Sequence, residues 1–193
     1  MKNERLFTIP NVLSFYRLVS FPFLLFLCIK GQEDWFAILL IINLITDVLD
    51  GFIARNFNQK TDLGARLDSL ADIGSYILAV LGVFVFKWDI ISEHLPSFLS
   101  FLGLYMSTIL FSLIKFGKFT SFHLYSSKIG GYLQGFFFVL LFSGYFFESY
   151  YLFAMFWGIL SFIEHLSIQI IIPKLESNLK GLYWVLKSKS FSQ

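Results

Sequence analysis

The chain has 193 residues, of which 56% are hydrophobic and only 15% are charged, and it contains 26 phenylalanines, far more than a soluble domain of this length usually carries. This composition excludes an ordinary water-soluble fold and predicts a membrane protein. The net charge of +2 is small, and the lysines and arginines lie in short loops rather than in one dense stripe. We therefore expect no nucleic-acid partner.

Six mostly apolar segments follow one another along the chain. Each is close to the length of about 20 residues that a helix needs to cross the hydrocarbon core of a membrane. Since no linker rich in proline, glycine or serine separates them, we expect a single domain over residues 1–193. The pattern predicts an all-α, polytopic membrane protein with six transmembrane helices at 10–29, 34–55, 64–86, 95–115, 129–147 and 150–172.

The two ends of the chain are predicted to lie outside the membrane core. The N-terminus forms a juxtamembrane segment, and the segment 173–193 combines lysines with leucines and aromatic residues, as a basic amphipathic tail at a membrane surface does. With the N-terminus inside, only Lys30 and Lys87 among the basic residues near the span ends fall on the outer side. We expect both termini to be cytoplasmic, in a bacterial inner membrane.

The second and third predicted spans each carry two aspartates in an otherwise apolar helix. Asp47 and Asp50 are three residues apart, and Asp68 and Asp72 are four apart, so each pair shares one helix face. The short loop between these spans makes the two helices antiparallel neighbours. We therefore expect the four carboxylates to converge just inside the cytoplasmic boundary.

Four carboxylates at a membrane boundary need compensating positive charge, because desolvation and mutual repulsion both oppose their ionisation. Arg55 and Arg66 can offset part of the charge, but several hard oxygen ligands fit one or two Mg²⁺ or Mn²⁺ ions better. Two such ions about 4 Å apart can clamp a diphosphate and stabilise both the attacking and the leaving oxygen. The alternative interpretation is a set of solvated charges at helix ends.

Small residues lie on the same helix faces as the aspartates. Gly51, Ala54 and Gly64 remove bulk there, which would let a nucleotide or a diphosphate approach the helix backbones. Close packing of membrane helices is the alternative explanation, since small residues three or four apart are common at such interfaces. Their position beside four aspartates favours the binding role.

From residue 47 to residue 72 the chain follows the pattern D-x2-D-G-x2-A-R-x8-G-x3-D-x3-D. This pattern resembles the signature of the CDP-alcohol phosphotransferase (CDP-alcohol phosphatidyltransferase) family, membrane enzymes of phospholipid synthesis with six helices. The resemblance implies that an acceptor hydroxyl attacks the phosphate of CDP-diacylglycerol or a related CDP-alcohol and that CMP is released. All eight fixed positions are filled, by Asp47, Asp50, Gly51, Ala54, Arg55, Gly64, Asp68 and Asp72.

The same resemblance implies a role for each of these positions, and it implies a homodimer. Four residues would hold two Mg²⁺ or Mn²⁺ ions: Asp47, Asp50, Asp68 and Asp72. Asp68 and Asp72 would be catalytic, with Asp72 as the candidate base for the acceptor hydroxyl. Five residues would border the cytidine diphosphate: Asp50, Gly51, Ala54, Arg55 and Gly64.

The acceptor alcohol is predicted less directly than the reaction. The opening FTIPNVLSFYRL resembles that of bacterial phosphatidylglycerophosphate synthases, which favours glycerol 3-phosphate, whereas the run LDSLAD is closer to phosphatidylserine synthases. An inositol-phosphate acceptor, or a soluble CDP-alcohol donor with a lipid acceptor, is also open. A divalent-cation transporter is a distant alternative, because the unusual polar residues fall in two neighbouring spans rather than in corresponding halves.

Two basic residues are candidates for binding an acceptor phosphate. Lys128 precedes a pair of glycines at the start of a span, although loop charge of the positive-inside kind also explains it. Arg17 lies one or two turns inside the first span, too deep for a routine flanking residue. Its alternative role is to reach back to the interface along its apolar stem.

Overall fold

The structure is a computed structural model of the chain. It describes residues 8–57, 59, 61–118, 122, 124–174 and 179–190, without the side chains of residues 62 and 188–190. The predicted juxtamembrane segment at the N-terminus and parts of the predicted tail lie outside the described residues.

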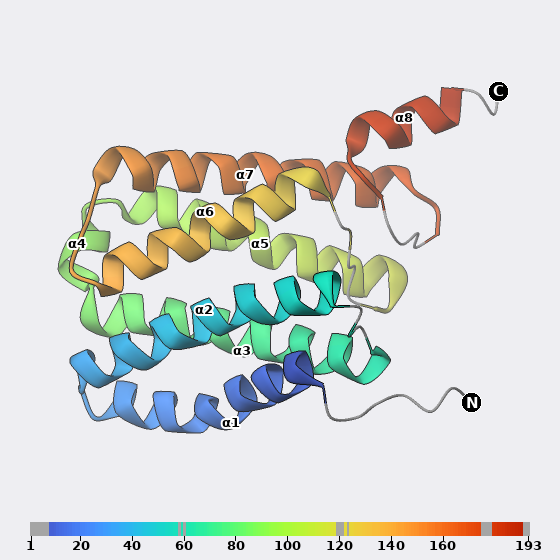
Figure 1. The fold of residues 1–193 in the computed structure, drawn as a ribbon. Helices are drawn as coiled ribbons and strands as arrows, with labels where there is room; N and C mark the ends of the chain where they lie inside the picture. Colours follow the sequence, from blue (N-terminus) through green and yellow to red (C-terminus); the bar gives the residue numbers. More distant parts are fainter. Residues whose placement is uncertain are drawn as a thin grey trace. The chain divides into compact units, whose positions relative to one another are not determined.

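The described residues form eight α-helices and no strand, which confirms the all-α fold class. Figure 1 shows them in chain order: α1 (Ile9–Ile29), α2 (Glu33–Asn56), α3 (Asp62–Phe86), α4 (Trp88–Ser92), α5 (Leu95–Phe116), α6 (Tyr125–Phe142), α7 (Glu148–Ile171) and α8 (Leu182–Ser190).

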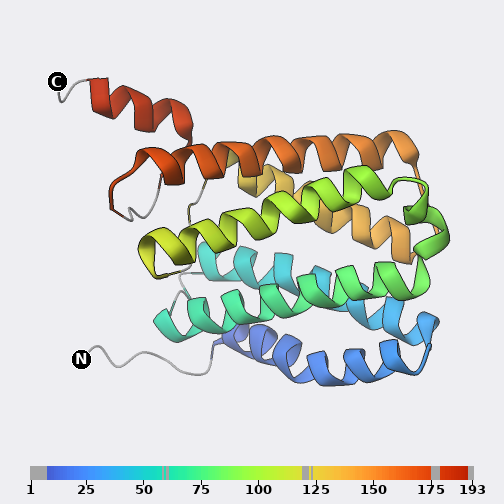
Figure 2. The same ribbon diagram turned by 180° about the vertical axis from the view of Figure 1, so that it is seen from behind.

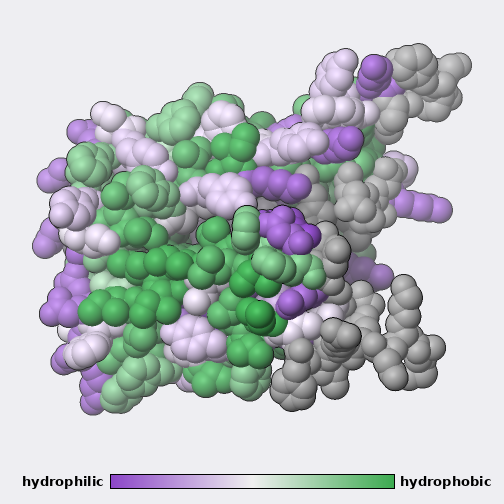
Figure 3. All heavy atoms as spheres, viewed as in Figure 1, coloured by the Kyte–Doolittle hydropathy of each residue, from purple (hydrophilic) through white to green (hydrophobic). Residues whose placement is uncertain are grey.

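Five of these helices are long and apolar enough to cross a membrane, namely α1, α2, α3, α5 and α7. Figure 3 shows a largely hydrophobic surface along α2, with hydrophilic residues towards its ends. Helix α6 has 18 residues, carries Ser126, Ser127, Lys128 and Gln134, and is not among the five. The five spans agree with five of the six predicted segments, and the sixth span stays a prediction.

One compact unit consists of Met1–Ser92 and Phe138–Tyr145. Within it α1, α2 and α3 lie side by side, with α1 against both of the others (Figures 1 and 2). The turn from α1 to α2 is tight because Gly31 adopts a left-handed conformation with a φ of 68°. The apolar core of this unit includes the buried side chains of Leu24, Phe36 and Leu78.

The second compact unit consists of Glu93–Phe137 and Phe146–Gln193, and α5 packs against α7 in it. Gly158 of α7 makes this packing close, since a Cβ there would collide with the ring of Phe101. Polar groups are paired as well: Gln169 Nε2 donates to the carbonyl of Thr108 over 3.1 Å. That residues 1–193 form a single domain stays a prediction.

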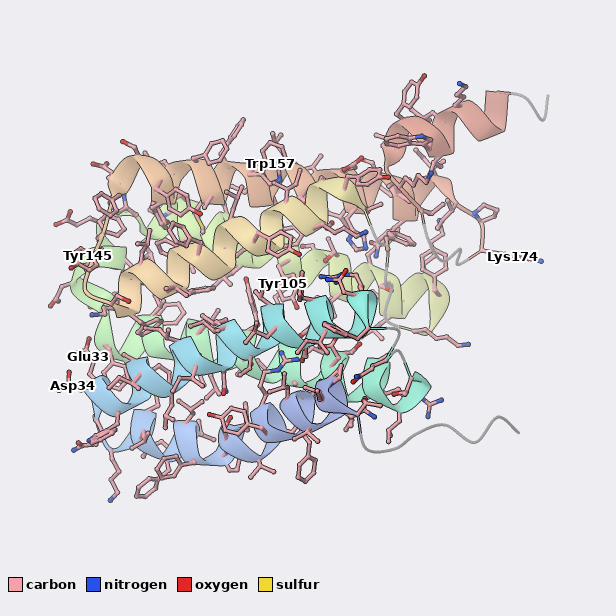
Figure 4. All side chains as sticks on the ribbon, in the orientation of Figure 1. Glu33, Asp34, Tyr105, Tyr145, Trp157 and Lys174 are labelled. Atoms are coloured by element: carbon pink, nitrogen blue, oxygen red, sulfur yellow. The ribbon has the colours of Figure 1, made fainter. Side chains whose placement is uncertain are left out.

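Glu164 of α7 joins α6 and α8 within this second unit. One carboxylate oxygen accepts a hydrogen bond from Ser126 Oγ, and the other accepts from the backbone N–H of Leu182 over 2.8 Å. Trp157, labelled in Figure 4, donates to the carbonyl of the same Ser126 over 3.0 Å. Helix α8 exposes Tyr183, Trp184 and Leu186. That it rests on a membrane surface stays a prediction.

Candidate metal centre

Helices α2 and α3 bring the four aspartates of the pattern over residues 47–72 together in the first unit. Asp47 and Asp50 lie in the C-terminal half of α2, and Asp68 and Asp72 lie in the N-terminal half of α3. Glu33 and Asp34, labelled in Figure 4, mark the opposite, N-terminal end of α2. The convergence of the four carboxylates that the spacing predicts is therefore present.

A single guanidinium, that of Arg17 on α1, contacts all four carboxylates. Its Nη1 lies 2.5 Å from Asp47 Oδ1 and 2.8 Å from Asp72 Oδ1. Its Nη2 lies 2.6 Å from Asp50 Oδ2 and 2.8 Å from Asp68 Oδ1. Arg17 thus lies among the aspartates rather than reaching back to the interface. Its planar fork of donors suits several carboxylates at once.

The carboxylates differ in how deeply they lie. The Asp50 side chain is only 3% exposed and also accepts a hydrogen bond from Ser14 Oγ over 3.1 Å. The side chains of Asp47, Asp68 and Asp72 are 40%, 42% and 50% exposed, respectively. The cluster therefore has a closed side at Asp50 and a side that a ligand can approach.

Three of the aspartates fit a divalent metal by geometry as well as by chemistry. Asp47, Asp50 and Asp68 each offer a carboxylate oxygen, and these atoms lie within 4.8 Å of one another. Oxygens at about 2.0–2.6 Å from a central ion are what Mg²⁺ and Ca²⁺ take in proteins. Asp72 is not part of this close group, but it shares Arg17 Nη1 with Asp47. The donor set suits a hard divalent cation.

The residues that carry this cluster match a known protein family. The family model described as CDP-alcohol phosphatidyltransferase matches residues 7–165, which include Arg17 and all four aspartates. The chain belongs to the CDP-alcohol phosphatidyltransferase family. Members of this family depend on divalent metal in general, in agreement with the oxygen cluster.

Several curated proteins are similar to part of this family member. The chain is 37% identical over 87 residues to a cardiolipin synthase (CMP-forming) of Streptomyces coelicolor, which covers 42% of this chain and 40% of that protein. It is 38% identical over 80 residues to a CDP-diacylglycerol–glycerol-3-phosphate 3-phosphatidyltransferase of Cereibacter sphaeroides, covering 38% and 35%. It is 43% identical over 91 residues to a human cardiolipin synthase (CMP-forming), covering 46% and 29%. The chain thus spans less than half the length of these relatives, and no solved structure matches it.

The remaining positions of the family pattern surround the aspartates. A Cβ on Gly51 would lie 3.1 Å from Nη1 of Arg55, so the arginine side chain folds over this glycine. Ala54 is half-buried and Arg55 is exposed at the end of α2. Gly64 faces α1, and the side chains of Asn11 on α1 and of Thr61, the residue before α3, fill the space beside it. Contact of these residues with a nucleotide stays a prediction.

Lys128 belongs to the second compact unit, in the first turn of α6. Its Nζ lies 5.9 Å from the centre of the Tyr125 ring, within the range of a cation–π contact. Its role at the acceptor stays a prediction.

Sequence reasoning did not anticipate the polar stripe on α1. Asn11, Ser14, Arg17 and Ser20 follow at intervals of three and are all buried. Ser20 exchanges hydrogen bonds with Asn43 of α2, and Asn11 accepts from Thr61 at the start of α3. The regular spacing of four polar residues in an apolar helix is the signal that could have identified this face.

Proposed function

We propose that the protein transfers the phosphatidyl group of CDP-diacylglycerol to glycerol 3-phosphate and releases CMP. The observation that carries this proposal is the convergence of four aspartates from α2 and α3 in a member of the CDP-alcohol phosphatidyltransferase family. Relatives named as CDP-diacylglycerol–glycerol-3-phosphate 3-phosphatidyltransferases support this donor and acceptor.

In the proposed reaction the acceptor hydroxyl oxygen forms a bond to the phosphorus that carries the diacylglycerol. The bond between this phosphorus and the bridging oxygen breaks, and CMP leaves with the electron pair. The hydroxyl proton passes to Asp72, whose half-exposed carboxylate makes it the candidate base. Asp68, in α3 one turn before it, is the second proposed catalytic residue.

We propose that Asp47, Asp50, Asp68 and Asp72 hold two Mg²⁺ or Mn²⁺ ions. When bound, such ions neutralise the charge of the diphosphate and of the leaving CMP. Asp50 would hold an ion from the buried side, where it accepts a hydrogen bond from Ser14, and the three more exposed carboxylates would hold ions from the open side. Gly51, Ala54, Arg55 and Gly64 are proposed to border the cytidine diphosphate.

The acceptor phosphate is proposed to meet basic side chains. Arg17 is a basic residue that contacts the carboxylates. Lys128 is proposed as an acceptor-binding residue from its place in the sequence alone. We also propose that the active centre and both termini face the cytoplasm of a bacterial inner membrane, and that the protein is a homodimer, as the sequence resemblance implies.

The test is CMP release by purified protein with CDP-diacylglycerol and Mg²⁺ against a panel of acceptors. The panel contains glycerol 3-phosphate, serine, inositol and inositol phosphate. Because several relatives are named as cardiolipin synthases, it also contains phosphatidylglycerol, the alcohol from which one more phosphatidyl transfer makes cardiolipin. CMP release that depends on glycerol 3-phosphate supports the proposal. If CMP is released with a different acceptor alone, the reaction stands and the proposed acceptor is wrong. If folded protein releases no CMP with any acceptor, the proposed reaction is contradicted.

A further inference from the structure

Arg17 is a cation that the chain itself supplies to the aspartate cluster. Its side chain is fully buried, and it donates to one oxygen of each of the four carboxylates over 2.5–2.8 Å. Four ionised carboxylates carry four negative charges and the guanidinium carries one positive charge. The cluster therefore keeps a net negative charge that attracts further cations.

The guanidinium and a divalent ion need the same region of space. The metal-binding oxygens are contributed by Asp47, Asp50 and Asp68, which are also hydrogen-bond acceptors of Arg17. An ion bound at about 2.1 Å from such oxygens would stand against guanidinium nitrogens that are themselves less than 3 Å from them. Two cations at that separation repel each other, so one must give way to the other.

Two features of the site favour a position of Arg17 that can change. Within the part of the chain that the structure describes, Arg17 Nε is buried and has no hydrogen-bond partner, so the present arrangement does not satisfy all of its donors. Asp50, the most buried carboxylate, also accepts a hydrogen bond from Ser14, a contact that does not involve the guanidinium. The cluster thus has a fixed point that does not depend on Arg17.

We propose that Arg17 and divalent ions are alternative occupants of the aspartate cluster. The guanidinium holds the four carboxylates together before metal binds, and metal binding displaces it. Arg17 is accordingly a positioning residue that sets how tightly metal is held. This inference rests on the proposed function, since it requires a divalent ion at the aspartates.

Mn²⁺ titration of the purified protein, followed by electron paramagnetic resonance, tests the competition. Removal of the competing guanidinium in R17Q is expected to tighten Mn²⁺ binding by about 5- to 150-fold, the usual range of coupling between two binding events. R17Q is also expected to melt at a lower temperature than wild type without metal, and the difference is expected to shrink at saturating Mn²⁺. If Arg17 were only a structural clamp, its loss would let the carboxylates separate and would weaken Mn²⁺ binding.

R66Q is the matched control, because Arg66 is an exposed arginine near the start of the same α3, two residues before Asp68. It removes the same charge near the cluster and is expected to change Mn²⁺ affinity far less than R17Q does. R17K keeps the charge with fewer donors and is expected to bind Mn²⁺ more tightly than wild type, which decides the question if R17Q does not fold. If wild type binds Mn²⁺ and folded R17Q binds it equally or more weakly, the competition is overturned and the metal site stands. The same result with R17K decides the matter where R17Q does not fold. Absence of Mn²⁺ binding by folded wild type and folded variants overturns the metal site of the proposed function and this inference with it.

Discussion

The side-chain oxygen of Asn11 occupies the space that a side chain at Gly64 would need. Asn11 lies on α1 and Gly64 in the first turn of α3, and Thr61 Oγ1 links them: it donates to Asn11 Oδ1 and accepts from the backbone N–H of Gly64 over 2.9 Å. The glycine of the family pattern therefore allows α1 to approach α3 just before the aspartates. This gives Gly64 a packing role alongside the nucleotide contact proposed for it.

G64A is expected to destabilise the protein by about 1–3 kcal/mol, the usual cost of forcing an extra carbon into a packed site. The added Cβ would collide with Asn11 Oδ1 and Thr61 Oγ1, so these side chains must shift and the contact between α1 and the start of α3 is disturbed. Thermal unfolding of the purified variant in detergent measures the effect.

G103A is the control for G64A. Gly103 lies within α5, and an added Cβ there meets no atom within 4 Å. Because alanine is a better helix former than glycine, this variant is expected to unfold at the same or a higher temperature than wild type. Equal melting of G64A and G103A would contradict the packing role of Gly64.

Glu164 is expected to hold the start of α8 against α6 and α7. E164A removes the acceptor for Leu182 N–H and for Ser126 Oγ, two hydrogen bonds to a charged group. Loss of one such bond costs about 1.5–3 kcal/mol. Trypsin cleavage after the exposed Lys180 is expected to accelerate by about tenfold or more, since each 1.4 kcal/mol corresponds to a factor of ten in an opening equilibrium.

S167A is the control for E164A, because Ser167 Oγ donates to a carbonyl of its own helix, that of Ile163. Its cleavage rate should match wild type. If E164A is cleaved no faster than S167A, Glu164 does not hold α8 in place.

The number of spans can be counted by single-cysteine labelling in intact cells, with Cys28 replaced by serine. K118C lies after α5 and K174C lies after α7, so they bracket α6 and α7. Six spans place both cysteines in the cytoplasm, where a membrane-impermeant reagent does not reach them. E93C, before α5, is the labelled control on the outer side. Labelling of K174C but not of K118C would mean that α6 does not cross the membrane.

Chelation is expected to abolish CMP release reversibly. The four aspartates provide oxygen ligands and no thiolate or imidazole, a donor set that suits Mg²⁺ or Mn²⁺. Excess chelator should reduce the rate to background, and Mg²⁺ or Mn²⁺ added beyond the chelator should restore it. Activity that persists at full strength in chelator would remove metal from the mechanism.

Much of the helical framework could be predicted because hydrophobic length defines membrane helices well. The predicted span 64–86 agrees closely with α3, and 95–115 agrees with α5. The segment 129–147 was wrong at both ends, since α6 runs from Tyr125 to Phe142. Gly144, with a φ of 86°, ends the helix: Tyr145 N–H bonds to the carbonyl of Leu140 and Gly144 N–H to that of Leu141. Hydropathy continues past this point and does not detect the stop.

The aspartate cluster could be predicted from spacing, but its internal cation could not. Asp47 with Asp50 and Asp68 with Asp72 share helix faces by simple periodicity, and a short loop joins the two helices. The position of Arg17 depends instead on how α1 is rotated about its axis against both helices. The spacing of residues within one helix carries no information about that rotation. The buried polar residues of α1, Ser14 and Arg17 among them, together mark the face that α1 turns towards its neighbours.

The most direct test of the central claim compares CMP release by D68N with that of wild type and of D34N, using CDP-diacylglycerol, Mg²⁺ and the acceptor panel. Asp68 offers one of the three clustered oxygens that could hold a metal ion, whereas Asp34 lies at the far end of α2 and controls for the loss of one carboxylate. The account predicts that D68N retains its fold and loses at least about a hundredfold in rate, the scale on which loss of one electrostatic partner of a transition state is felt. D34N is predicted to keep the wild-type rate. Substantial CMP release by folded D68N would contradict the assignment of the four aspartates as the reaction centre.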